Sequence, residues 1–162
     1  MKIAACALII ISCYSLGLSV SKRAKLRLEE ANGMLKLLEY INLRISTLHY
    51  LEDIVDEFEC RALTENGFLP TLRNRHVFAP FNERFSTAIK CFEDDKELYR
   101  SLKTVSEGLG TMDLERQQKV LSACTEELKA TVNTLKENYN TKSKCYKSLG
   151  ALLGMMITVL LI

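Results

Sequence analysis

The C-terminal third of the chain limits the fold more than any other stretch. From Thr111 to Ile162 the sequence contains no proline and no turn signal. Leucines recur every seven residues along its first half, with Cys124 and Val132 beside them; they are Leu114, Leu121, Leu128 and Leu135. This repeat is typical of a long amphipathic helix that packs along a coiled-coil-like seam. Because four other helical segments precede it, we expect the leucines to form the spine of an intramolecular bundle.

The composition favours helices throughout. Seven glycines and two prolines in 162 residues leave few breaks for a many-stranded fold. Apolar residues recur at helical spacing in four segments between 25 and 109. The sequence therefore predicts an all-α fold, a bundle of about five to six antiparallel helices with membrane helices at both ends.

Four segments before the long helix carry this periodicity. The first follows Lys25 and has Met34, Leu38, Ile41, Ile45 and Leu48 on one face. A second covers 51–62 and has an acidic face that we interpret as solvated; it ends before the turn signal Asn66-Gly67. The segment 71–79 is expected to be a loop. Pro80 then precedes a third helix with an aromatic stripe: Phe81, Phe85, Ile89 and Phe92. Asp94 or Asp95 is expected to cap the fourth helix, whose apolar face is Leu98, Leu102, Val105 and Leu109.

Both ends of the chain are apolar and flanked by basic residues. Residues 3–20 contain no charge, and as a helix they would span about 27 Å, enough for a bilayer core. The C-terminal run 149–162 would span only about 21 Å. The basic flanks are Lys22, Arg23, Lys25 and Arg27 after the first run, and Lys142, Lys144 and Lys147 before the second.

By the positive-inside rule, these flanks predict a cytoplasmic middle segment. The expected domains are an N-terminal transmembrane helix (1–21), a cytoplasmic helical domain (22–147) and a C-terminal transmembrane helix (148–162). Two alternatives remain open. The first run could be a signal peptide cleaved near Gly17 or Ser19, which would release a secreted bundle with a generic protein-binding role. The last run could be a buried core helix.

Residues suited to catalysis or metal binding are scattered. The six cysteines form no C-x-x-C pair, and His49 and His76 are far from any of them in sequence. No Ser, Cys or Asp frames His76 as a catalytic triad requires. A formal net charge of +2 provides no general attraction for nucleic acid. We therefore expect no catalytic residues, cofactor, metal, nucleic acid or small-molecule substrate, although a thiol or hydrolytic enzyme remains the competing class.

The glycine-rich turn before the long helix is the candidate binding feature. Gly108 and Gly110 are expected to supply the positive φ angles of a helix end and a tight reversal. Asp113 is placed to cap the long helix, and Gln117 lies one turn later on the same face. Together with Gln118 these residues form a candidate contact surface, or they only tie down the turn. In the last segment, Gly150 and Gly154 form a small-x-x-x-small face suited to close helix packing in a membrane.

The segment 109–119 (Leu-Gly-Thr-Met-Asp-Leu-Glu-Arg-Gln-Gln-Lys) resembles a pattern of the stage III sporulation protein AB family. The resemblance extends to Lys147-Ser-Leu-Gly150 and to the plan of a short N-terminal span, a basic stretch, a helical domain and an apolar end. Residues 44–51 differ from the Glu-Ile-x-Tyr-x-x-Thr-Pro-Leu stretch common in the family, since Arg44 replaces Glu and the proline is absent.

The resemblance implies a component of the channel between mother cell and forespore in endospore-forming bacteria. It also implies a soluble domain similar to those of type II secretion protein F. The expected role is a non-enzymatic platform in the mother-cell membrane that links a secretion-type ATPase to other stage III sporulation channel proteins.

Overall fold

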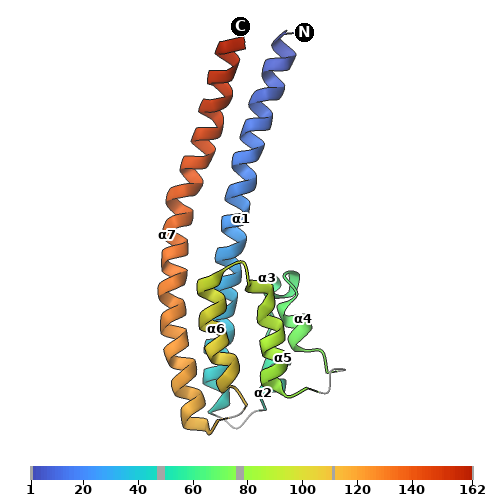
Figure 1. The fold of residues 1–162 in the computed structure, drawn as a ribbon, viewed down its shortest axis with the longest axis vertical. Helices are drawn as coiled ribbons and strands as arrows, with labels where there is room; N and C mark the ends of the chain where they lie inside the picture. Colours follow the sequence, from blue (N-terminus) through green and yellow to red (C-terminus); the bar gives the residue numbers. More distant parts are fainter. Residues whose placement is uncertain (1, 47–49, 76–78, 111, 162) are drawn as a thin grey trace. The chain divides into compact units, whose positions relative to one another are not determined.

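A computed structural model describes residues 2–46, 50–75, 79–110 and 112–161 (Figure 1). Within these ranges the chain is all-helical, with no β-strand, which confirms the predicted fold class. It forms two compact units. The first unit, here called the helical pair, consists of residues 1–28 and 133–162. The second, the helical domain, consists of residues 29–132.

The helical pair is built from the ends of the two longest helices, α1 (Lys2–Ile45) and α7 (Leu114–Leu161). Its two segments run in opposite directions (Figure 1). Hydroxyl groups bond back to the helix in its N-terminal segment, where Ser15 Oγ donates to Ser12 O at 2.8 Å and Ser19 Oγ donates to Ser15 O at 3.0 Å.

Among the described residues, no helix is both long enough and apolar enough to cross a membrane. Most side chains of the two predicted membrane segments, 1–21 and 148–162, lie outside the described residues.

The helical domain contains the inner parts of α1 and α7 and all the shorter helices. These are α2 (Leu51–Glu57), α3 (Arg61–Glu65), α4 (Phe68–Leu72), α5 (Phe81–Ala88), the 3₁₀ helix η1 (Ile89–Phe92) and α6 (Lys96–Gly108). The described residues thus form seven α-helices, more than the five to six that the sequence predicts.

The extra helices arise because the region 51–72 breaks twice. The predicted helix 51–62 divides into α2 and α3, and Phe58 takes an extended conformation (φ −82°, ψ 120°) between them. The predicted turn at Asn66-Gly67 is confirmed, since Gly67 has a φ of 88° and the Asn66 side chain accepts a bond from Phe68 N at 3.0 Å. This turn starts α4, and Pro70 is tolerated there because first-turn N–H groups have no helical partner.

The core of the helical domain follows the predicted apolar faces. Met34, Leu38 and Ile41 of α1 are fully buried, as are Phe85 and Ile89. Phe68 joins the aromatic stripe, and its ring lies 5.6 Å from that of Phe85 in an edge-to-face arrangement typical of aromatic pairs. The predicted apolar face of α6 is also buried: Leu98, Leu102, Val105 and Leu109.

The leucine stripe of α7 is only partly buried. Leu121 and Leu128 are fully buried, with Cys124 and Val132 beside them. Leu114 is 40% exposed, because it stands at the first turn of α7 beyond the edge of the core. The stripe is therefore the spine of the helical domain from Leu121 to Val132, about three turns of α7.

Candidate partner-binding site

The turn between α6 and α7 is held by backbone geometry. Leu109 is buried, and its N–H bonds to Val105 O at 3.0 Å, which closes the last turn of α6. Gly110 has a φ of 77° and reverses the chain. A Cβ at Gly110 would lie 3.8 Å from Leu51 Cδ1 and 3.9 Å from Phe81 Cβ, so the turn contacts the first residues of α2 and α5.

The expectation that both glycines need a positive φ is wrong for Gly108. Gly110 and Gly67 are the described glycines with a positive φ, and Gly108 is the last residue of α6. A Cβ there would lie 3.5 Å from Met112 Sδ and from Val120 Cγ1, an ordinary contact distance, so neither the backbone nor the packing at this position requires glycine.

Two residues of the predicted surface, Asp113 and Gln117, have different roles at the start of α7. Asp113 immediately precedes the helix, and its carbonyl accepts the Gln117 N–H at 3.0 Å, as an N-cap residue does. Its exposed carboxylate lies 3.4 Å from Arg116 Nε. Gln117 donates from Nε2 to Met112 O at 2.5 Å and so fastens the turn. Its Oε1 is buried and has no hydrogen-bond partner among the described residues.

Gln118 does not belong to the turn. It lines an open groove of about 540 Å³ within the helical domain. We call it the α1–α7 groove. Its lining comes from α1 (Glu39, Asn42, Leu43, Ser46) and α7 (Gln118, Ser122, Thr125, Glu126, Lys129). The structure therefore separates the predicted residues, with Gly108, Gly110 and Asp113 in the turn, Gln117 joining the turn to α7, and Gln118 in the groove.

A direct bond and an ion network connect the two walls of the groove. Asn42 Nδ2 donates to Ser122 Oγ at 3.3 Å. Lys129 Nζ lies 3.0 Å from Glu126 Oε1 and 3.4 Å from Glu39 Oε1. The hydrogen bond and charge of Glu126, and then those of Glu39, raise the pKa of Lys129, so this cation stays charged at physiological pH.

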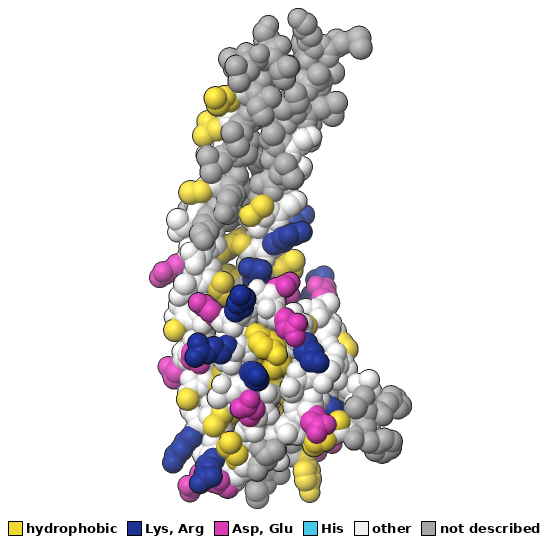
Figure 2. All heavy atoms as spheres, viewed as in Figure 1, with side chains coloured by type: hydrophobic (Ala, Val, Ile, Leu, Met, Phe, Trp, Pro, Cys, Tyr) yellow, Lys and Arg dark blue, Asp and Glu magenta, His cyan; other side chains and the backbone are white. Residues whose placement is uncertain are grey.

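Sequence reasoning missed this groove, although a signal was present. Small uncharged polar residues occur at helical spacing beside the leucine stripe of α7, namely Gln118, Ser122 and Thr125. Asn42 and Ser46 repeat the pattern on α1. The solvent-facing sides of other helices carry charged residues instead. Figure 2 shows described basic and acidic side chains interspersed on its visible face of the helical domain.

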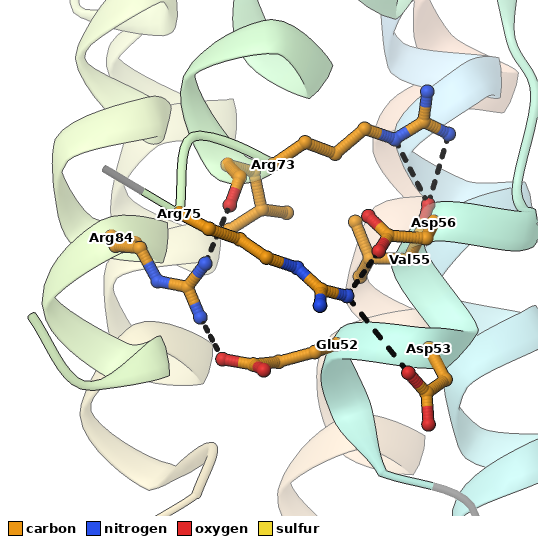
Figure 3. Close-up of polar contacts among 8 residues, drawn as sticks. Glu52, Asp53, Val55, Asp56, Arg73, Arg75 and Arg84 are labelled. Carbon is orange, nitrogen blue, oxygen red and sulfur yellow. Dashed lines mark hydrogen bonds and ion pairs between the residues drawn. The ribbon is translucent and has the colours of Figure 1, made fainter. Parts of the chain in front are cut away.

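A second polar cluster joins α2 to the segment that follows α4 (Figure 3). Arg84 of α5 is buried, pairs with Glu52 and donates to Leu72 O at 3.4 Å. Arg75 pairs with Asp56 and lies 3.9 Å from Asp53. The acidic face of α2 is exposed, in agreement with its interpretation as a solvated surface, and Glu52, Asp53 and Asp56 also form ion pairs on it.

Arg73 explains why α2 ends where it does. Its guanidinium donates to Val55 O at 2.9 and 3.2 Å and also to Phe58 O. These are carbonyls at the C-terminus of α2, where intrahelical donors run out and a cation is favourable. In segment 71–79, Arg73 therefore binds the C-terminal end of α2. Residues 76–78, which include His76, and residues 47–49, which include His49, lie outside the described residues.

The described side chains offer little for catalysis. No group of three or more His, Cys, Asp or Glu residues among them could hold a metal ion. Burial, and then the charge of Glu127, raise the pKa of Cys124 to about 11, so this thiol stays protonated and unreactive. Cys124 Sγ instead donates to Ser101 O at 3.4 Å, inside the core. Gly150 and Gly154 fall within α7, but their surroundings lie outside the described residues.

These features define a class of protein: a small helical domain, fitted with a polar groove and a tightly fastened turn, continuing into two long helices. Comparison with family models matches residues 2–162 to stage III sporulation protein AB, and the chain belongs to this family. The chain is thus a sporulation-related protein, as the resemblance at 109–119 predicts. Comparisons with curated proteins and with solved structures gave no match.

Proposed function

We propose that this protein is a non-enzymatic platform of the channel between mother cell and forespore, linking a secretion-type ATPase to channel proteins. The single observation that carries this proposal is the family match, which extends over residues 2–162. The family is named for a stage of sporulation, and its model matches both long helices and the helical domain. This match supports a role in sporulation for the protein as a whole.

The proposal includes anchoring in the mother-cell membrane through residues 1–21 and 148–162. Support comes from the charge-free run 3–20 and from basic residues on the domain side of both apolar runs. Both runs also belong to one compact helical pair with opposite chain directions, as two segments of a common anchor would. The helical domain then lies in the cytoplasm, where an ATPase is accessible.

A binding role fits the helical domain better than a catalytic one. Some of its polar residues fasten the fold, as Arg73 and Gln117 do, and others line an open groove. The described thiols include one that is buried and held protonated, Cys124. Binding surfaces need exposed and shaped contacts, which the α1–α7 groove and the nearby exposed side chains provide.

Affinity purification of the full chain tests the proposal. The tagged protein would be extracted in detergent from sporulating cells of its own bacterium, and the ATPase and channel proteins would be quantified by mass spectrometry. We expect enrichment of both at least about tenfold over an unrelated tagged membrane protein. Recovery of neither one would remove the basis for a platform role.

A further inference from the structure

The α1–α7 groove has an excess of negative charge. Lys129 is the single cation among its lining residues, and two carboxylates, Glu39 and Glu126, surround it. The exposed fractions of these side chains are 47% for Glu39, 74% for Glu126 and 43% for Lys129. The carboxylates therefore keep free oxygen atoms on the solvent side that can accept hydrogen bonds from a further cation.

An apolar side chain stands beside this charge. Leu43 is 70% exposed, one helical turn after Glu39 on α1. Together with Tyr50, Met112 and Leu114, it belongs to the large hydrophobic residues of the helical domain that are exposed. Leu114 precedes Gln118 by one turn of α7, which places a further exposed apolar side chain close to the end of the groove lining.

The dimensions and lining suit a helix. The α7 wall from Gln118 to Lys129 has a length of about 16 Å, room for about three helical turns. Small side chains on both walls, including Ser46 and Ser122, leave space for the side chains of an occupant. The groove lies between α1 and α7, which run antiparallel (Figure 1). A third helix can pack its ridge of side chains into the space between two such helices.

We propose that the α1–α7 groove is the docking site for an amphipathic helix of a partner protein. That helix carries an apolar residue, which packs on Leu43, and a Lys or Arg three or four positions away, which pairs with Glu39 and Glu126. The inference rests on the proposed function, because a platform requires such a partner, and it assigns the contact to one surface.

Photocrosslinking in the full chain tests this assignment. A benzophenone amino acid would replace Ser122 in the groove or, as a matched control, the exposed Ser86 on α5. After irradiation of sporulating cells, the crosslinked peptide would be sequenced. We expect an adduct from position 122 and not from position 86, formed with a helical segment that has the stated apolar and basic spacing.

A second experiment exchanges the charges of the proposed ion pair, so that the proposal does not depend only on finding a crosslinked peptide. Glu126→Lys should reduce the adduct yield at position 122 at least about fivefold, since it places a cation opposite the partner's cation. Replacing the partner's basic residue with Glu should restore the yield. An adduct with a second copy of this chain, an adduct with a peptide lacking that spacing, no specific adduct at 122, or indifference to Glu126→Lys would each overturn the proposal.

Failure here differs from failure of the platform role. If the tagged chain recovers the ATPase but position 122 gives no specific adduct, the groove assignment is wrong and the platform stands. If purification recovers neither ATPase nor channel proteins but position 122 crosslinks to a helix of the expected chemistry, the groove stands and the platform role fails.

Discussion

Asn42 and Ser122, eighty residues apart in sequence, are joined by a hydrogen bond of 3.3 Å. Their neighbours Ile41 and Leu121 are fully buried, so the bond lies at the edge of the core where α1 meets α7. It links the beginning of the helical domain to its end. The same pair forms part of the groove lining, and the contact that closes the domain therefore also shapes its candidate binding surface.

Arg84→Met should destabilise the helical domain. The substitution keeps much of the apolar stem but removes the pair with Glu52 and a donor to Leu72 O. We expect a loss of about 2 kcal/mol in the free energy of unfolding, less than for a fully buried pair because Glu52 is half-exposed. Denaturant unfolding of the full chain in detergent measures this. Lys90→Met, at an exposed position, should change stability by no more than about 0.5 kcal/mol. Equal stability of the two variants would contradict a stabilising role for Arg84.

Gly33→Ala should be destabilising, although Ala is normally the better helix former. A Cβ at this position would lie 2.7 Å from Cys60 Sγ and 3.1 Å from Leu63 Cγ. We expect a loss of about 1–3 kcal/mol from overpacking. In a double-mutant cycle, Cys60→Ala should recover most of that loss because it removes the closest atom. A Gly33→Ala variant at least as stable as the wild type would show that α1 does not approach Cys60 this closely.

The two glycines of the α6–α7 turn should respond differently to alanine. Gly110→Ala forces a side chain into a φ of 77° and should cost about 1–2 kcal/mol. Gly108→Ala should be tolerated within about 0.5 kcal/mol, since the helical position accepts a Cβ at ordinary contact distances. Thermal unfolding of both variants measures the difference. The reverse order would mean that Gly108 makes the reversal.

Cys124 should make stability fall at alkaline pH. Burial raises its pKa from 9.0 to about 11 in the folded protein, so the folded state keeps a proton that the unfolded state releases. The contribution is fully present below pH 9 and is lost as the pH rises toward about 11. The free energy of unfolding should therefore fall more steeply between these values in the wild type than in Cys124→Ala. Parallel pH profiles of the two would contradict burial of this thiol.

Thiol labelling provides a separate check on the same residue. Cys145 is exposed and should react rapidly with a maleimide under native conditions, whereas Cys124 should react only after unfolding. Mass spectrometry of digested protein after timed labelling assigns each site. Rapid native labelling of Cys124 would show that its position in the core is wrong.

Helical periodicity was enough to predict the long-range plan. Among the described residues, the apolar faces of α1 and α6 are buried as their spacing predicts, because each helix buries the one face that is apolar. In the aromatic stripe Phe85, Ile89 and Phe92 are buried and Phe81 is half-buried. Asp95 caps α6 by accepting a bond from Leu98 N at 3.3 Å, also as predicted. These features depend on neighbouring residues and can be deduced from local sequence.

The features that sequence did not predict depend on distant partners. The end of α2 is fixed by Arg73, eighteen positions beyond Val55, and local spacing contains no sign of that bond. The pairing of Glu52 with Arg84 spans thirty-two positions. In the candidate site, the turn could be located from its glycines, but Gln118 belongs to a groove that exists only where α1 and α7 lie side by side.

Membrane topology is the most direct test of the central claim that a membrane-anchored platform presents its helical domain to the cytoplasm. In a chain with its six cysteines replaced, single cysteines at Lys25 and Thr141 would be probed with an impermeant maleimide, on intact cells and after permeabilisation. The account predicts that both positions are protected in intact cells and labelled once the membrane is opened. Labelling of both from outside would contradict it, because the domain would then lie on the side away from any cytoplasmic ATPase.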